Sequence, residues 1–337
     1  MRAVGYQTPG PITAERSLVD IELPRPTPGA QDLLVAVKAI SVNPVDTKVR
    51  KRPKADPQAW AVLGWDAAGV VVEAGPGVTR FKAGDEVFYA GDITRPGANA
   101  EFHCVDERIV GRKPATLGFA EAAALPLTAI TAWEAMFDRL DVMKAVPGAA
   151  PAILIVGGAG GVGSIAVQLA RKRTDLTVIA TASRPETIAW AKDLGAHHVV
   201  NHSKPLAKEV AALGLGAPAF VFSTTGTGGH LAAIAELIAP QGRFALIDDP
   251  DSLDVNVFKR KSVSIHWEFM FTRSMFMTAD IGAQGALLDE VSALVDRGVL
   301  KTTLAEVLGP INAANLKKAH AVIESGKARG KLVLEGS

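Results

Sequence analysis

The sequence is poor in the groups that several classes of protein require. It has one cysteine, Cys104, which excludes an intrachain disulfide and any metal site that needs two thiolates from one chain. No run approaches the roughly 18 apolar residues of a membrane-spanning helix. The segment Met1 to Gly10 also lacks the apolar run of a signal peptide. We therefore expect no membrane partner and a location in the reducing cytoplasm.

Net charge is also nearly absent. Lys plus Arg number 36 and Asp plus Glu number 35, which gives a formal charge of +1. Such a balance provides no field that would attract nucleic acid or an anionic surface, so we expect neither as a partner. The one basic run, Lys48 to Arg52, is predicted to be a solvated loop. With 337 residues, of which 48% are hydrophobic and 21% charged, the chain suits a globular protein of two domains.

Short apolar runs broken by glycine and proline fill the chain up to Pro126. Leu33–Ile40, Gly69–Glu73 and Glu86–Tyr89 have the alternation and composition of strands. This zone is therefore predicted to be mostly β structure. Helical spacing then begins at Phe119–Leu125 and resumes at Ala129–Leu140, with an interruption predicted at Pro126.

Beyond this zone, apolar strands alternate with amphipathic helices. That order indicates a parallel sheet covered on both faces, and six strands suit a doubly wound dinucleotide-binding fold. The predicted strands are Ala152–Val156, Thr177–Thr181, His198–Val200, Ala219–Phe222, Arg243–Ile247 and Val263–Ile265, and the helices among them include Val162–Arg173, one that Pro185 opens and Gly195 ends, and His230–Ile238.

The remaining zone, from Trp267 on, is too small to form an independent domain. It is predicted to contain two helices, Gln284–Asp296 and Ala313–Ser325, and a final strand, Gly330–Leu334. We expect this zone to return and complete the first one. The predicted nucleotide-binding domain is thus 127–266. The predicted catalytic domain consists of 1–126 together with 267–337.

A glycine-rich turn directly follows the strand Ala152–Val156. Gly158, Gly160 and Gly163 satisfy G-x-G-x-x-G between a predicted strand and a predicted helix. Glycines there allow a tight turn and let backbone N–H groups meet a pyrophosphate at the positive end of the helix. We predict that Gly158, Gly160, Gly161, Val162 and Gly163 bind a dinucleotide; the alternative is a tight turn without a ligand.

The choice of cofactor is read at the end of the next strand. An NAD site needs an acidic residue there to bind the ribose 2′-hydroxyl group, but no carboxylate occurs before Glu186. Ser183 can instead donate to a 2′-phosphate, and Arg184 supplies a bidentate cation. NADPH is therefore predicted over NADH. The alternative is that both residues are only the start of a helix.

The chain resembles the quinone oxidoreductase branch of the medium-chain dehydrogenase/reductase superfamily, closest to the zinc-type alcohol dehydrogenase-like proteins. The resemblance covers nearly the whole chain. Besides the glycine turn, its carriers are Ser41–Thr47 (SVNPVDT), Gly64–Gly69 (GWDAAG), Gly84–Val87 (GDEV), Leu125–Ala129 (LPLTA) and Gly330–Leu334 (GKLVL).

This resemblance implies an α/β protein with a β-rich GroES-like catalytic domain, a doubly wound domain with a six-stranded parallel sheet, and an active site in the cleft between them. It also implies nicotinamide-side roles for Asn43, Asp46 and Thr128, each of which is alternatively a turn or cap residue. The family further suggests that the edge after the last nucleotide-domain strand pairs across a homodimer.

The chain departs from zinc-containing relatives at the metal. They place a cysteine where Asn43 stands and a histidine where Trp65 stands, and they carry a four-cysteine lobe that one cysteine cannot build. Asp66 matches an acidic residue near the metal, but one carboxylate is not a site. We therefore expect no zinc.

An acceptor that delocalises negative charge needs no metal for its reduction. Hydride addition to a quinone or an α,β-unsaturated carbonyl gives a phenolate or an enolate, whereas alcohol dehydrogenation needs a stabilised alkoxide. Trp65, Met270 and Phe271 are predicted to line an apolar pocket for such a substrate. Trp267 and Phe269 are assigned to a subunit interface instead. Tyr89 is a candidate proton donor by chemistry and zone only, and a structural role is the favoured alternative.

Three functions therefore compete. The first is a zinc-independent, NADPH-dependent reductase of quinones or enones. The second is a zinc-dependent alcohol dehydrogenase, which the missing ligands disfavour. The third is a non-catalytic NADPH-binding sensor or structural protein, because binding needs the same cofactor motifs as catalysis.

Overall fold

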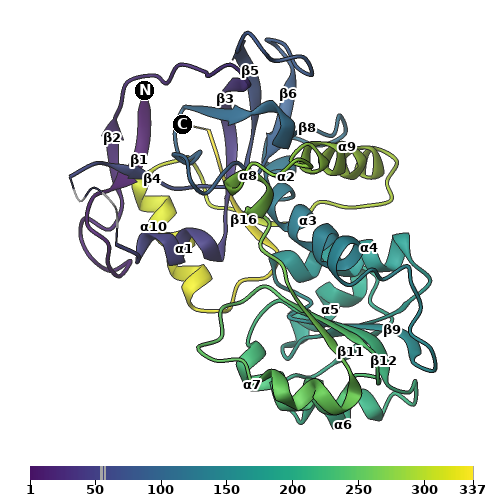
Figure 1. Cartoon of the computed structure of the whole chain (residues 1–337). Coiled ribbons are helices and arrows are strands. Elements are labelled where there is room, and N and C mark those ends of the chain that lie inside the picture. The colour runs from purple at the N-terminus through teal and green to yellow at the C-terminus, as the bar shows by residue number, and fades with distance from the viewer. Residues whose placement is uncertain (54–55, 57, 337) are drawn as a thin grey trace. The chain divides into compact units, whose positions relative to one another are not determined.

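The computed structural model describes residues 1–53, 56 and 58–336. They form two compact units, one of residues 131–270 and one of residues 1–130 together with 271–337 (Figure 1). The first unit is α/β and the second is rich in β structure, which confirms the predicted fold class. We call them the nucleotide unit and the β-rich unit.

The nucleotide unit is built on a six-stranded sheet in which every pairing is parallel. With the strands numbered within this unit, their order is 3-2-1-4-5-6, the order of a doubly wound dinucleotide-binding fold. Across the sheet the strands are β11 (His198–Val200), β10 (Thr177–Thr181), β9 (Ala150–Val156), β12 (Pro218–Ser223), β13 (Arg243–Leu246) and β14 (Ser264–Trp267).

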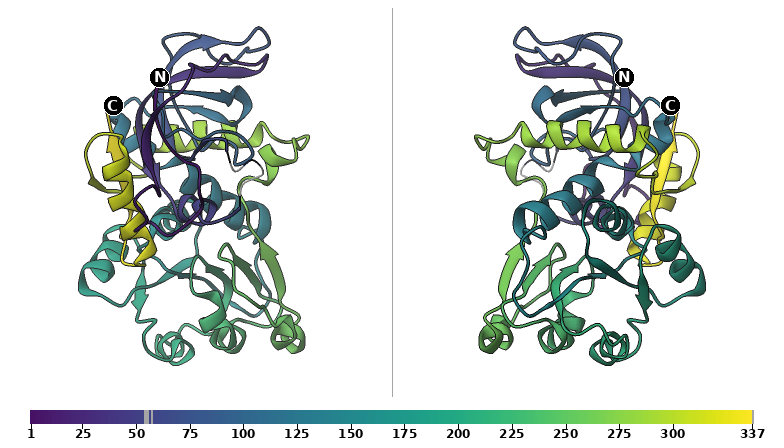
Figure 2. Two further views of the ribbon diagram at one scale, coloured as in Figure 1. Left: turned by 90° about the vertical axis from the view of Figure 1, so that its left-hand side faces the viewer. Right: turned by 90° about the vertical axis from the view of Figure 1, so that its right-hand side faces the viewer.

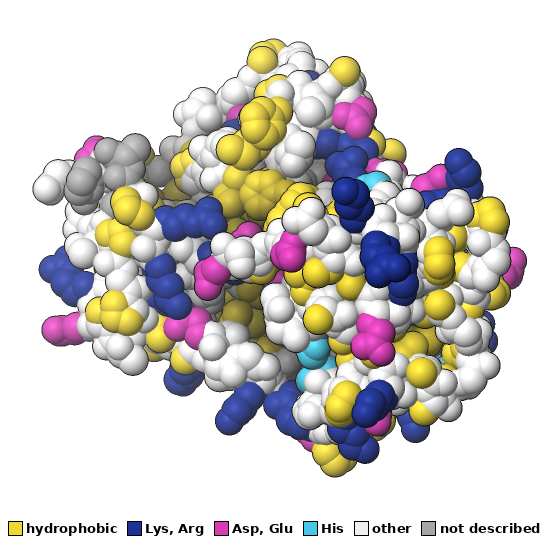
Figure 3. Space-filling view, turned by 60° about the horizontal axis from the view of Figure 1, so that its bottom comes forward, with side chains coloured by type: hydrophobic (Ala, Val, Ile, Leu, Met, Phe, Trp, Pro, Cys, Tyr) yellow, Lys and Arg dark blue, Asp and Glu magenta, His cyan; other side chains and the backbone are white. Residues whose placement is uncertain are grey.

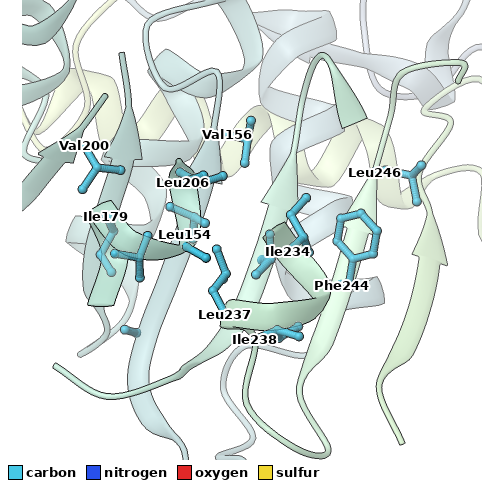
Figure 4. Packing of buried hydrophobic residues seen from close by; sticks show 14 of the residues in the cluster. Leu154, Val156, Ile179, Val200, Leu206, Ile234, Leu237, Ile238, Phe244 and Leu246 are labelled. Carbon is cyan, nitrogen blue, oxygen red and sulfur yellow. The ribbon is translucent and has the colours of Figure 1, made fainter. Parts of the chain in front are cut away.

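Helices cover both faces of this sheet (Figure 2). α4 (Gly161–Arg173) and α5 (Pro185–Asp193) pack on one face. On the other, α6 (Leu206–Ala211), α7 (Thr227–Leu237) and the 3-10 helix η3 (Val255–Lys261) enclose an apolar core (Figure 4). Alternate β9 residues such as Leu154 and Val156 reach that core, because successive strand side chains point to opposite faces. The sheet is therefore buried on both sides and holds the strand tips in place.

In the β-rich unit, the last strand of the chain joins strands formed much earlier. β16 pairs antiparallel with β3, so that Leu332 lies opposite Val42. The larger sheet has the order β15-β16-β3-β5-β6-β8, with β7 also on β3, and a smaller sheet has the order β2-β1-β4. The strands are β1 (Arg2–Tyr6), β2 (Val19–Glu22), β3 (Asp32–Val42), β4 (Ala61–Val62), β5 (Ala67–Ala74), β6 (Glu86–Tyr89), β7 (Phe102–Asp106), β8 (Val110–Arg112), β15 (Leu304–Val307) and β16 (Lys331–Glu335).

The helices of this unit confirm one sequence prediction and correct another. The helical segment is interrupted at Pro126 as expected, because α2 (Phe119–Ala123) ends before it and α3 (Pro126–Trp133) begins at it. Proline suits this first position, since it lacks only an N–H group that the first turn leaves unpaired anyway. The basic run is not a loop, because it lies largely in α1 (Pro44–Arg50) and Arg50 is buried. The remaining helices are α8 (Thr272–Met275), α9 (Ala283–Asp296) and α10 (Ala313–Glu324).

Arg50 ties α1 to the C-terminal helix. Its guanidinium donates to the Gly10 carbonyl oxygen at 2.6 Å and to His320 Nδ1 at 3.3 Å, and it pairs with Glu324. α10 lies beside α1 in Figure 1. Arg50 was predicted to be solvated, but its guanidinium is part of the packing between α1 and α10.

The surface carries charge of both signs. On the face drawn in Figure 3, Lys and Arg side chains are interspersed with Asp and Glu side chains. Among the described residues, no helix combines the length and apolar character that crossing a bilayer requires.

A buried carboxyl group lies just beyond β14. Glu268 is 3% exposed and accepts a hydrogen bond from Arg139 Nε at 3.0 Å. Burial raises the pKa of Glu268, and the neighbouring carboxyl of Glu134 raises it further, while Arg139 opposes the rise. Glu134 and Arg139 both belong to the π-helical turn Glu134–Arg139 that continues α3.

This raised pKa predicts a pH-dependent stability. The folded state holds the Glu268 proton more tightly than the unfolded chain, so stability should fall as the pH rises above 4.5, the usual value for glutamate. Glu268→Gln should remove this loss, because the amide is never charged. The variant's melting temperature should exceed that of the wild type at about pH 9 and approach it at about pH 5. Exposed Glu236→Gln is the control, and equal pH profiles for wild type and Glu268→Gln would contradict the prediction.

Candidate functional site

At the turn between β9 and α4, Gly157, Gly158 and Gly163 have no space for a side chain. Gly157 has a φ of 81°, which is left-handed backbone that favours glycine. A Cβ on Gly163 would lie 2.1 Å from the Gly157 carbonyl oxygen, and one on Gly158 would lie 2.6 Å from the Ala180 Cβ. The glycines at 158 and 163 thus bring strand and helix backbones into direct contact.

The same turn presents the positive end of a helix. Gly160 is the N-cap of α4 and has no side chain to cap it. The N–H groups of Gly161, Val162 and Gly163 belong to the first turn, where no carbonyl precedes them within the helix. Over 13 residues, the aligned peptide dipoles favour an anion at this end. The residues present therefore fit a dinucleotide pyrophosphate.

Thr181, at the end of β10, fixes the turn in place. Its hydroxyl oxygen accepts the Gly157 N–H at 3.0 Å, and its carbonyl oxygen accepts the Gly158 N–H at 3.1 Å. His202 Nδ1 lies 3.2 Å from the same hydroxyl oxygen. Sequence reasoning did not single out Thr181 or His202, because their roles depend on which strands are neighbours.

Ser183 and Arg184 follow β10 directly and are half-buried. Arg184 is the N-cap residue of α5, and its Nε lies 3.1 Å from Glu186 Oε1. No carboxylate occurs between the end of β10 and Glu186. In this fold, a ribose 2′ group is recognised at the carboxyl end of the second strand. Here that position carries the Ser183 hydroxyl and the Arg184 guanidinium.

In the β-rich unit, the Asp46 carboxylate accepts hydrogen bonds from two backbone N–H groups and so fixes the turn at Asn43. Asp46 Oδ2 accepts the Asn43 N–H at 2.6 Å, and its Oδ1 accepts the Gly64 N–H at 3.1 Å. Burial raises the pKa of Asp46 to about 7, although both N–H donors and the Lys331 ammonium oppose the rise. Asp46 therefore anchors the start of α1 to the loop at Gly64.

The Asn43 side chain points away from that turn, into a buried polar cluster. Its Nδ2 donates to Asp66 Oδ2 at 2.9 Å, and its Oδ1 accepts from Lys331 Nζ. Lys331 Nζ also lies 2.9 Å from Asp66 Oδ2 and 3.2 Å from the Val42 carbonyl oxygen. All three polar side chains are buried. We refer to Asn43, Asp66 and Lys331 as the lysine cluster.

Asp66 also reaches α3. Its Oδ1 accepts the Leu127 N–H at 2.9 Å, and the Thr128 hydroxyl donates to the Leu125 carbonyl oxygen at 3.1 Å. Burial raises the pKa of Asp66, although Lys331 and the neighbouring donors oppose the rise. Because every group around its two oxygens is a donor, we assign the ionised carboxylate. Of the predicted nicotinamide-side residues, the structure joins Asn43 to the cluster and places Thr128 next to the residue that Asp66 holds.

The predicted substrate-wall residues are all buried. Trp65 donates from Nε1 to the Asp92 carbonyl oxygen at 3.1 Å, and its ring meets Phe271 edge-on with centroids 6.1 Å apart. Met270 belongs to the nucleotide unit. Tyr89, the proton donor suggested by chemistry, is buried with its hydroxyl 3.1 Å from His103 Nδ1, and burial raises its pKa.

The side chains at the expected metal position do not suit zinc. Asn43 offers an amide, and the Trp65 indole has no lone pair to coordinate a metal. The ammonium of Lys331 already bonds the oxygens of Asn43 and Asp66 that would face a cation. Among the described residues, no group of three or more His, Cys, Asp or Glu side chains could hold a metal ion.

A doubly wound nucleotide unit with a glycine turn, in one chain with a β-rich unit, defines an oxidoreductase of the dehydrogenase type. The Alcohol dehydrogenase GroES-like domain family matches residues 29–134, and the Zinc-binding dehydrogenase family matches residues 194–334. A Zinc-type alcohol dehydrogenase-like protein of Staphylococcus aureus (strain MSSA476) is 38% identical over 336 residues, which is 99% of each chain. The chain therefore belongs to the zinc-type alcohol dehydrogenase-like proteins of the medium-chain dehydrogenase/reductase superfamily.

A further relative and three solved structures extend the comparison. The 2-methylene-furan-3-one reductase of Solanum lycopersicum is 29% identical over 90% of this chain and 71% of its own. A Rhizobium etli CFN 42 structure, provisionally assigned to the zinc-dependent alcohol dehydrogenases, is 72% identical over 100% of this chain and 98% of its own, with a TM-score of 0.98. A quinone oxidoreductase of Pseudomonas syringae is 28% identical over 99% of each chain, with a TM-score of 0.83. A mycobacterial protein in complex with NADPH is 25% identical over 99% of this chain and 100% of its own, with a TM-score of 0.81.

Gly163 provides a test of the turn. Gly163→Ala would force the Gly157 carbonyl away, and we expect affinity for a nicotinamide dinucleotide to fall by at least tenfold, as measured by calorimetry, because the N–H groups that face the pyrophosphate would shift. Gly229→Ala is the matched control: Gly229 lies in α7 with no atom near its added Cβ. The control should keep full affinity, and unchanged affinity in Gly163→Ala would contradict the assignment.

Proposed function

We propose that this protein is a zinc-independent, NADPH-dependent oxidoreductase that passes hydride to a quinone or to an α,β-unsaturated carbonyl compound. The observation that carries the proposal is the glycine turn at the tip of β9, with Ser183 and Arg184 at the tip of the neighbouring strand β10. The mycobacterial structure with bound NADPH supports the choice of cofactor.

NADPH, when bound, supplies a hydride from its nicotinamide ring. The chain contributes binding and position. The turn Gly158–Gly163 holds the pyrophosphate through backbone N–H groups, and Ser183 and Arg184 hold the 2′-phosphate. For the nicotinamide side, we assign Asn43 and Asp46 to positioning, because their polar atoms bond within the β-rich unit. We keep Thr128 as the hydroxyl that orients the ring.

The proposed acceptors are compounds whose reduced form delocalises the negative charge that hydride addition creates. A phenolate or an enolate is delocalised, so its formation does not depend on a Lewis acid. The quinone oxidoreductase of Pseudomonas syringae and the tomato reductase, whose named substrate is a conjugated ketone, support these two classes. Trp65, Met270 and Phe271 stay assigned to the wall of the substrate pocket.

We also include a homodimer in the proposal. β14 is the last strand of its sheet, and Trp267 and Phe269 expose about half of their surface. An edge strand with exposed aromatic residues favours pairing with another chain. A sedimentation mass equal to one chain would contradict this part.

Turnover with a panel of acceptors tests the function. We expect NADPH oxidation with quinones and enones, unchanged by prior dialysis against a chelator, and no oxidation of simple alcohols with NADP. Zinc at one ion per chain together with alcohol oxidation would favour the metal-dependent alternative. Bound NADPH without any turnover would favour the sensor or structural alternative.

The assignment of Ser183 and Arg184 predicts a selective loss of affinity. The double substitution Ser183→Ala with Arg184→Ala should weaken NADPH by about 10- to 100-fold, the value of losing charge-assisted hydrogen bonds. NADH should be nearly unaffected, because it lacks the 2′-phosphate. Exposed Arg260→Ala, in the same unit, should change neither affinity. Calorimetry with both cofactors decides, and an equal loss for both would refute the assignment.

A further inference from the structure

The lysine cluster is a complete receptor for one primary ammonium group. An ammonium has three N–H donors, and Lys331 Nζ has three acceptors: the Val42 carbonyl oxygen, Asn43 Oδ1 and Asp66 Oδ2. One acceptor is the Asp66 carboxylate, so its negative charge compensates the positive charge of the ammonium. Because the cluster is buried, water contributes little to compensate either charge.

The cluster lies at the position where the family resemblance would place a metal ion. By the family resemblance, Asn43 and Asp66 stand where zinc-containing relatives have a metal ligand and an acidic residue near the metal. In this chain a cation is still present between them, but it is carried by the side chain of residue 331. The three acceptors are oxygens, and one is a backbone carbonyl, whereas zinc sites in proteins favour histidine and cysteine.

We propose that Lys331 supplies the resident cation of this site, and that removal of its side chain leaves a binding site for a small primary alkylammonium ion. The proposal rests on the zinc-free part of the proposed function and not on the identity of the acceptor. The ammonium sets the Asn43 amide with its oxygen toward Lys331 and its nitrogen toward Asp66. Lys331 is thus a positioning residue for Asn43 and a counter-ion for Asp66.

The test uses Lys331→Ala in the full chain. Alanine keeps Cβ and removes three carbons and the nitrogen, which are the atoms of n-propylammonium. Because the substitution leaves a buried carboxylate without its partner, we expect the melting temperature to fall by about 6–20 °C. n-Propylammonium should then raise it in a saturable way, by about 3–6 °C at ten times its dissociation constant.

Three controls make this rescue specific. Tetramethylammonium at the same ionic strength has no N–H donor and should not rescue Lys331→Ala. The wild type and exposed Lys38→Ala should gain nothing from n-propylammonium, because the receptor in both is already filled. Lys331→Ala combined with Asp66→Asn should melt higher than Lys331→Ala alone, since the unpaired charge is gone, and should also lose the rescue.

If Lys331→Ala does not fold by itself, expression and refolding with n-propylammonium should recover folded protein, and tetramethylammonium should not. Several results would overturn the inference: no stabilisation by the amine, equal stabilisation by tetramethylammonium, rescue that persists without Asp66, or stoichiometric zinc in the wild type that Asp66→Asn abolishes. Absence of turnover with quinones and enones would refute the proposed acceptors and leave these melting results intact. The two failures are therefore distinguishable.

Discussion

The pairing of β16 with β3 is the contact on which the β-rich unit depends. It places Leu332 opposite Val42, so that Lys331, which precedes Leu332, meets Asn43, which follows Val42. Lys331 enters a region where a buried carboxylate would otherwise have no counter-charge, and a buried charge without a partner is among the costliest features a fold can carry. The turn at Asn43, the loop at Asp66 and the start of α3 all bond to this one charge pair or to each other. A strand register thus determines whether the polar cluster exists.

Under the proposed function, the nucleotide unit has to meet a different requirement, which is to bring its backbone close to a charged ligand. Close approach requires that nothing project from Gly158 or Gly163, and that the turn not move when an anion arrives. Thr181 meets the second requirement by holding Gly157 and Gly158 from the neighbouring strand. Rigidity there comes from a sheet buried on both faces, since strand tips cannot shift without disturbing the core around Leu154 and Val156. The affinity of such a site depends on the N–H groups that the turn donates and equally on the sheet, which keeps the turn from moving.

Periodicity predicted the nucleotide unit well and the β-rich unit in part: Glu86–Tyr89 is a strand and Ala313–Glu324 a helix as expected, but other strands were missed. Apolar runs such as Thr177–Thr181 and His198–Val200 match their strands residue for residue, because strands buried on both faces are continuously hydrophobic. The short strands β4, β8 and β15 and the first strands of the chain gave no such signal, since their residues alternate weakly or pair through long-range register. Arg50 was assigned to solvent because a charge run says nothing about a distant partner such as Glu324. Lys331 was noticed only as part of a family motif. Its role depends on the fold, which brings it to Asp66 across a separation of 265 positions in the sequence.

The split of the β-rich unit around an inserted nucleotide unit has a consequence for synthesis on the ribosome. Residues 131–270 are contiguous, so their sheet can form as soon as they emerge, in the usual N- to C-terminal sequence of domain folding. Asp66 is made early but receives its counter-ion only when β16 has been translated. Until then the half-built β-rich unit holds an unpaired carboxylate and an open strand edge at β3, both of which favour an unfolded or chaperone-bound state. Residues 131–270 can therefore complete their sheet before β16 closes the β-rich unit.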